Sequence, residues 1–120
     1  MVKVERINLD KEGLTKFFSP NEARILELLW KEGEMTSAMI TEELEDLSHA
    51  VVAGTLDRLV KSGFVERRLD EGGPRLRYIY SPVGGRDEVG MRISERVLDS
   101  LAETFGDATL AALGRVRRDR

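Results

Sequence analysis

The sequence of 120 residues contains no cysteine. Disulfide bonds, thiolate metal sites and thiol redox chemistry are therefore excluded. No stretch approaches the roughly 20 consecutive apolar residues that a membrane-spanning helix needs. Residues 1–16 are rich in charge and lack the apolar core of a secretory signal. We therefore expect a cytoplasmic protein with no membrane partner.

The residue types that carry catalysis are also sparse. His49 is the single histidine, and no carboxylate stands in a spacing that would make a catalytic set with it. The Gly-Gly pairs at 72–73 and 84–85 do not belong to a phosphate-binding loop pattern. We therefore expect no enzyme and no cofactor. Four acidic residues close together could suggest a cation site, but we interpret them as an exposed helix end: Glu42, Glu43, Glu45 and Asp46.

Charge is unevenly distributed along the chain. The formal net charge is -3, and 41% of the residues are hydrophobic and 34% charged, which is typical of a globular protein. Residues 1–47 carry a net charge of -5, residues 48–80 a net +2, and residues 81–120 are balanced. Because DNA binding needs a local positive face, the middle segment is the one that could contact phosphates.

Three helices are expected between residues 19 and 62, where apolar residues recur at helical spacing between capping signals. The first spans about residues 20–31, after a capping box of Ser19 and Glu22, and Gly33 ends it. The second begins at Thr36 or Ser37. Its inward side chains should be Met39, Ile40 and Leu44.

The third helix is expected from the cap Ser48 to about residue 62, with Gly63 as its stop. Its two sides differ in chemistry. The side predicted to face the core contains Val52, Thr55, Leu56, Leu59 and Val60. The opposite side contains Ala50, Val51, Gly54, Asp57, Arg58 and Lys61.

Two short alternating runs, 64–69 and 76–80, flank a Gly-Gly-Pro turn and predict a β-hairpin, with Tyr78 and Tyr80 packed inward. Helix, helix, helix and hairpin within about sixty residues is the order of a winged helix-turn-helix domain. We therefore predict a mainly α protein with a small β-hairpin, in which residues 1–82 form the DNA-binding domain.

A fourth helix is expected from about residue 86 to 105, and a shorter one after Gly106-Asp107. The apolar side chains of the fourth helix cover most of its circumference, so it needs cover from more than one side. We interpret residues 83–120 as a helical region that forms a homodimer, in preference to a lid on its own domain. The predicted interface residues are Val89, Ile93, Val97, Leu101, Phe105, Leu110 and Leu113.

The arrangement resembles the penicillinase-repressor (BlaI/MecI-like) family of regulators. The residues that carry the resemblance lie between Gly13 and Leu113. They are Gly13-Leu14, Ser19 to Ala23, the apolar run ending at Trp30 to Gly33, Thr55 to Gly63, Arg77 to Tyr80, and Phe105 to Asp107 followed by Leu110. The resemblance implies a dimeric repressor that binds a palindromic operator with its third helix in the major groove. Copper sensing by thiolates is excluded by the absence of cysteine.

The predicted partner is double-stranded DNA, contacted by the start of the second helix, the third helix and the hairpin arginines. The predicted DNA-binding residues are Thr36, Ser37, Ser48, His49, Ala50, Val51, Gly54, Arg58, Lys61, Arg67, Arg68, Arg75 and Arg77. Two of these have another interpretation. His49 could be an ordinary exposed residue at a helix start, and Gly54 could instead allow close packing of the second helix.

Two other functions compete with the repressor hypothesis. One is a winged-helix module that binds protein, which the negative net charge and the small side chains of the third helix allow. The other is a ligand-sensing regulator of another winged-helix family, MarR-like or PadR-like. A basic strip joining the third helix to the hairpin would oppose the protein-binding module. The sequence does not identify the inducing signal, whether a small molecule or a protease.

Overall fold

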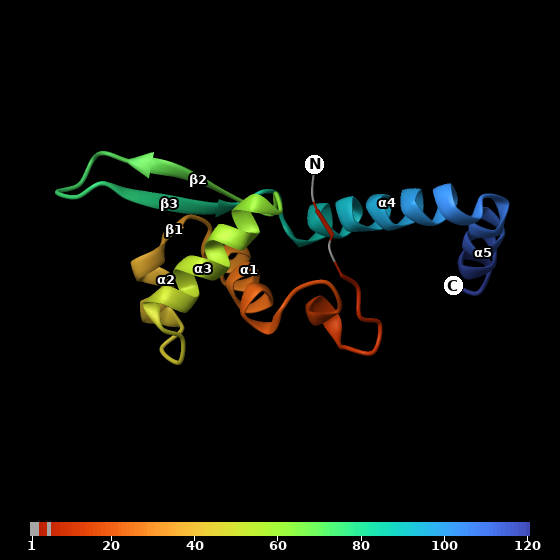
Figure 1. Ribbon diagram of the computed structural model, residues 1–120, viewed down its shortest axis with the longest axis horizontal. Coiled ribbons are helices and arrows are strands. Elements are labelled where there is room, and N and C mark those ends of the chain that lie inside the picture. The colour runs from red at the N-terminus through yellow and green to blue at the C-terminus, as the bar shows by residue number, and fades with distance from the viewer. Residues whose placement is uncertain (1–2, 5) are drawn as a thin grey trace. The chain divides into compact units, whose positions relative to one another are not determined.

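The computed structural model describes residues 3–4 and 6–120 (Figure 1). In this part of the chain the elements are η1 (Gly13–Lys16), α1 (Pro20–Glu32), β1 (Met35–Thr36), α2 (Ser37–Glu43), α3 (His49–Lys61), β2 (Val65–Asp70), β3 (Arg77–Pro82), α4 (Arg86–Phe105) and α5 (Asp107–Arg118). The predicted order of helices and hairpin is confirmed. The 3-10 helix η1 and the two-residue strand β1 were not predicted, because elements this short carry no periodic pattern.

The chain divides into two compact units, the first reaching Val89 and the second spanning Gly90–Arg120. The division falls inside α4. The functional boundary predicted after residue 82 stays a prediction, and the predicted start of that domain at residue 1 lies outside the described residues.

The first unit has a continuous core between α1, α3 and the sheet. The capping box of α1 is present: the Ser19 hydroxyl accepts from the Glu22 backbone N–H, and the Glu22 carboxylate accepts from the Ser19 N–H. The helix thus fixed buries Ile25, Leu26 and Leu29 completely, and α3 buries Val52, Thr55, Leu56 and Leu59. The predicted inner side of α3 is thereby confirmed for these four residues. Val60 is half-buried.

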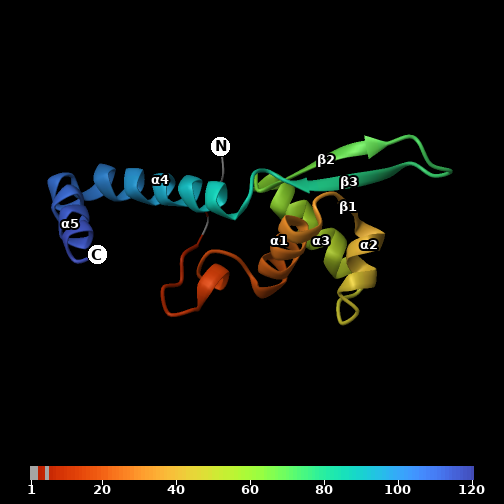
Figure 2. The same cartoon turned by 180° about the vertical axis from the view of Figure 1, so that it is seen from behind.

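The hairpin belongs to a three-stranded antiparallel sheet with the order β1-β3-β2. Met35 pairs with Tyr80 and Thr36 with Ile79, so β1 ties the start of α2 to the hairpin. Because β3 lies between both neighbours, its inner half is fixed on two sides. The outer half of the hairpin, from Asp70 to Arg77, extends beyond the helices in both views (Figures 1 and 2).

Two predicted orientations in the first unit are wrong. Tyr80 is buried but Tyr78 is 43% exposed, because Tyr78 lies further out along the hairpin, paired with Leu69 beyond the helices. Met39 is 46% exposed instead of facing the core. It follows the Thr36 cap by three residues and its backbone N–H bonds to that cap, while the next residue, Ile40, fills the core position.

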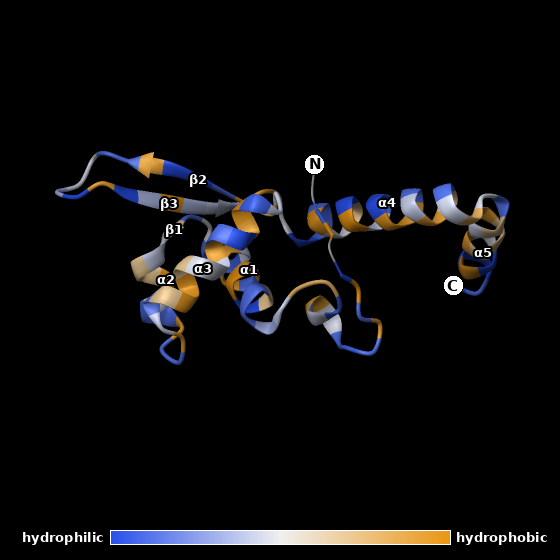
Figure 3. Cartoon of the chain, viewed as in Figure 1, coloured by the Kyte–Doolittle hydropathy of each residue, from blue (hydrophilic) through white to orange (hydrophobic). Residues whose placement is uncertain are grey.

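The second unit contains most of α4 and all of α5, joined at Gly106, whose φ of 61° lies in the left-handed region that favours glycine. Residues of high and low hydropathy alternate along the ribbons of both helices (Figure 3). No residue of α5 is buried. Among the described residues, no helix is both long and apolar enough to cross a membrane.

Candidate nucleic-acid interface

Helix α3 presents an exposed face of small side chains at its N-terminal end. Ser48 caps the helix by accepting a hydrogen bond from the Val51 backbone N–H at 3.1 Å. The residues that follow it on the surface are His49, Ala50 and Val51, all exposed. The opposite side of the helix is fixed in the core by Val52 and Leu56. The core therefore determines which side of α3 remains free for a partner.

Gly54 lies on the same outward side and keeps the backbone of α3 accessible. A Cβ built there would meet only the Arg58 guanidinium, at 3.7 Å. That is ordinary contact with the end of a flexible side chain. The alternative that Gly54 permits close packing of α2 is therefore not supported, since no atom of α2 lies near the position a Cβ would take.

The start of α2 is closely bound to the rest of the fold. Thr36 is 6% exposed, and its hydroxyl accepts from the Met39 backbone N–H at 3.2 Å. The Thr36 hydroxyl therefore serves as the cap of α2, and the predicted contact of Thr36 with DNA stays a prediction. Ser37 is half-buried, and its carbonyl accepts a hydrogen bond from the Thr41 hydroxyl at 2.8 Å.

Cationic side chains of the C-terminal half of α3 and of strand β2 act on the same carboxylate, that of Asp57. Lys61 and Asp57 form an ion pair at 3.0 Å, as the i, i+4 spacing predicts. The hydrogen bond from Lys61 lowers the pKa of Asp57 from its ordinary value, and the nearby charges of Arg67 and Arg58 lower it further. Three cations, two from α3 and one from β2, therefore surround one carboxylate. These cations therefore bring positive charge from the helix and from the hairpin to the same carboxylate.

The four hairpin arginines differ in how they are held. Arg68 pairs with Glu34 at 2.7 Å, and Arg77 pairs with Asp70 at 3.0 Å. The guanidinium of Arg67 lies 4.5 Å from the centre of the Tyr78 ring, a cation–π contact. Arg75 at the turn is exposed and has no protein partner among the described residues. All four stay exposed, so their donors can reach a phosphate.

Asp70 organises the hairpin turn. The Gly72 backbone N–H donates to its carboxylate at 3.1 Å, and Arg77 donates to the other oxygen at 3.0 Å. Both hydrogen bonds, the backbone one first, lower the pKa of Asp70. The turn thus keeps a defined geometry at the point where Arg75 projects.

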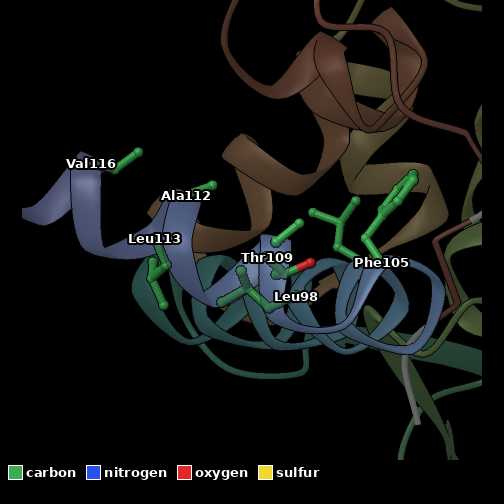
Figure 4. A pocket seen from close by; sticks show the side chains of 8 residues that line it. Leu98, Phe105, Thr109, Ala112, Leu113 and Val116 are labelled. Atoms are coloured by element: carbon green, nitrogen blue, oxygen red, sulfur yellow. The ribbon is translucent and has the colours of Figure 1, made fainter.

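A groove lies between α4 and α5 of the second unit (Figure 4). Its volume is about 330 Å³ and its lining is almost wholly apolar. The lining residues are Leu98, Leu101, Phe105, Ala108, Thr109, Ala112, Leu113 and Val116. Phe105 is 63% exposed, although it lines a groove within a single chain.

The predicted interface residues differ in how far they are exposed within one chain. Leu101, Phe105 and Leu113 line the groove, and Leu110 and Val97 are exposed and half-buried respectively. Val89 and Ile93 are 1% and 5% exposed within one chain. The part that these two residues play in a dimer interface stays a prediction, as it does for the other five.

Sequence reasoning missed several surface residues. Leu98, Ala108, Thr109, Ala112 and Val116 complete the groove, and only the relative placement of α4 and α5 shows that they belong together. The Thr41 Oγ1 lies 3.3 Å from the His49 Nδ1, although the two residues are eight positions apart in the sequence. No spacing rule predicts this contact. No group of residues suited to a metal ion occurs among the described residues.

The geometry defines a class: a winged-helix DNA-binding regulator. Solved structures share this fold. MarR superimposes with a TM-score of 0.53 and 23% identity, over 85% of this chain and 75% of that one. FabT of Streptococcus pneumoniae, solved in complex with DNA, superimposes with a TM-score of 0.52 and 18% identity, over 89% of this chain and 76% of that one. A search of curated proteins finds no match.

The family is more specific than the fold. The model of the penicillinase repressor family matches residues 18–117. The chain therefore belongs to that family, as the resemblance in the sequence indicated, and it is a DNA-binding transcriptional repressor.

Proposed function

We propose that this repressor acts as a homodimer on an operator with two inverted half-sites, each read by one α3 helix. The observation that carries the proposal is the grouping of Arg58, Lys61 and Arg67, from α3 and β2, whose charges act on Asp57, together with the exposed start of α3. A local positive surface of this kind suits phosphates even though the net charge is -3.

The arrangement supports different contacts at the two ends of α3, with bases at its start and phosphates further along. Ser48, His49, Ala50 and Val51 would meet base edges, with the two apolar side chains against thymine methyl groups. Gly54 would let the backbone come close to the groove wall. The phosphates would be contacted by Ser37, Arg58, Lys61, Arg67, Arg68, Arg75 and Arg77.

The second copy would cover the groove between α4 and α5. No residue of α5 is buried, and large apolar side chains of both helices stay exposed, among them Phe105 and Leu113. Two helices with so little core of their own are not expected to be stable in water. A second copy of the same groove would supply the missing cover symmetrically. The half-sites would then lie about 34 Å apart, or a multiple of that distance.

A protein-binding module and an enzyme are less well supported. A protein-binding winged helix would not need cations on both α3 and the hairpin. The family and the fold are those of transcriptional regulators, and nothing in the site suggests a reaction. The apolar groove has Thr109 as its one polar lining residue, which gives little support to a ligand-sensing regulator.

The test is selection of bound sequences from random duplex DNA, followed by affinity measurements at two salt concentrations. The proposal expects an inverted repeat and an affinity that falls steeply as salt rises. No enriched motif together with a flat salt response would refute it.

Phosphate contacts can be separated from base contacts with single variants. Arg75→Ala removes an exposed cation without breaking an ion pair, so it should weaken binding to all sequences alike and reduce the salt slope by about one. Arg96→Ala, an exposed cation on α4 outside the proposed DNA surface, is the matched control and should change neither quantity.

A further inference from the structure

His49 is held by a chain of two hydrogen bonds that crosses from α3 to α2. Its Nδ1 lies 3.3 Å from the Thr41 Oγ1, and that same Oγ1 donates to the Ser37 carbonyl oxygen at 2.8 Å. A threonine hydroxyl has one hydrogen. Because a carbonyl oxygen can only accept, the hydrogen of Thr41 is used on Ser37. The contact with His49 is then formed only if Nδ1 carries a hydrogen and donates it to Thr41.

This assignment determines what the other nitrogen does. A neutral imidazole has one hydrogen, so a protonated Nδ1 leaves Nε2 as a bare acceptor. His49 is exposed at the start of α3, and Nε2 has no protein partner among the described residues. The acceptor is therefore available to a ligand that offers a hydrogen-bond donor.

The four bases differ in whether they present a hydrogen-bond donor in the major groove. Cytosine presents its N4 amino group and adenine its N6 amino group, both donors, whereas guanine and thymine present acceptors at the corresponding positions. The small neighbours Ala50 and Gly54 do not compete for such a donor, since neither side chain has a polar atom.

We propose that Thr41 is a positioning residue that fixes the tautomer of His49, and that the resulting Nε2 acceptor selects an amino-bearing base, adenine or cytosine, at one operator position. This inference rests on the proposed DNA-binding mode, and it adds a specific base class and a residue that does not itself touch DNA.

The tautomer can be measured without DNA, because the chain has a single histidine. Two-bond 1H–15N correlation spectra of the full chain, recorded where the ring is neutral, report which nitrogen is protonated. We expect a protonated Nδ1 and a bare Nε2 in the wild type. Thr41→Val should return the ring to a mixture of tautomers, and Thr41→Ser should restore the wild-type pattern. A protonated Nε2 in the wild type would overturn the proposal, as would an unchanged pattern in Thr41→Val.

The base preference is measured on the selected operator, with each position changed to all four bases. One position should favour adenine or cytosine over guanine or thymine by about fivefold, the ratio given by one hydrogen bond of typical strength. His49→Ala and Thr41→Val should each abolish that preference, Thr41→Ser should keep it, and the salt slope should not change in any of them.

The outcomes separate the two claims. If the wild type enriches no motif, the proposed function fails while the tautomer remains measurable. If a motif is found but His49→Ala leaves every base preference unchanged, the inference fails and the repressor function stands. The amide spectrum of each variant verifies that the fold is intact.

Discussion

The two units of this protein bury their apolar side chains to very different extents. In the unit that reaches Val89, residues from α1, α3 and the sheet are fully covered, including Ile25, Leu56 and Phe64. In the unit from Gly90 to Arg120, Phe105 and Leu110 are 63% and 66% exposed. The first unit therefore covers its core within one chain, whereas the second unit would be covered by a second copy in the proposed dimer.

The difference explains why the same kind of pattern predicts one unit better than the other. A helical spacing of apolar residues predicts that one side of the helix is apolar, but it does not predict what covers that side. For α3 the cover is the rest of the domain, whereas the C-terminal part of α4 and all of α5 keep large apolar side chains exposed in the single chain. The predictions below test this contrast, from the largest expected effect to the smallest.

Leu56→Ala should have the largest effect, because Leu56 is completely buried on the core side of α3. Loss of the side chain leaves a cavity and should lower the free energy of unfolding of the first unit by about 2–5 kcal/mol. Chemical denaturation followed by Trp30 fluorescence measures this. The loss should be the same at all protein concentrations, and a concentration-dependent loss would mean that the first unit also depends on association.

Phe105→Asp should change the association of the second unit, in contrast to Leu56→Ala, which changes the stability of the first. A charge in the apolar groove should raise the dimer dissociation constant about a hundredfold or more. Sedimentation velocity over a dilution series measures it. The matched control is Ser100→Asp, which places the same charge on an exposed position of α4 that does not line the groove. Equal dissociation constants for the two variants would remove the groove from the interface.

Ser19→Ala removes the capping box of α1, in which Ser19 and Glu22 exchange hydrogen bonds at 3.2 and 2.8 Å. The expected loss is about 1 kcal/mol of unfolding free energy. Thermal denaturation measures it as a lower Tm. No change in the dimer dissociation constant should accompany it, since α1 belongs to the first unit.

Arg24→Ala should have the smallest effect. Arg24 binds both carboxylate oxygens of Asp46, at 2.7 and 2.8 Å, on the exposed surface. The hydrogen bond from Arg24 lowers the pKa of Asp46, so the pair stabilises the fold above the ordinary carboxyl range and loses that effect as the pH falls through the lowered pKa. NMR titration should show the pKa of Asp46 rising in the variant. The stability of the two proteins should converge once the pH is below the lowered pKa of Asp46, and a difference that persists there would contradict the assignment.

Much of the fold follows from local signals in the sequence. Ser19, Ser48 and Gly63 mark helix ends by their capping chemistry, and the structure places them there: Ser19 and Ser48 cap α1 and α3, and Gly63, with a φ of 86°, follows the end of α3. The α3 face predicted for the core is the buried one because four apolar or small side chains repeat at helical spacing.

Residues of the candidate site could be predicted from the sequence only where they lie on a single helix or strand. The outward face of α3 is contained in a single helical pattern, so its members could be listed from the sequence. The Thr41–His49 contact and the α4–α5 groove depend on how separate helices meet. The burial of Thr36 follows from its pairing with Ile79 in a strand two residues long, which has no sequence period.

The most direct test of this account is the mass of the full chain in solution, measured by sedimentation equilibrium with hydrogen exchange recorded at the same concentrations. The account predicts twice the 13.5 kDa of one chain at high concentration, with α5 amides protected only while the dimer persists. A mass of one chain throughout, with α5 amides still protected, would show that the second unit folds without a partner and would contradict the account.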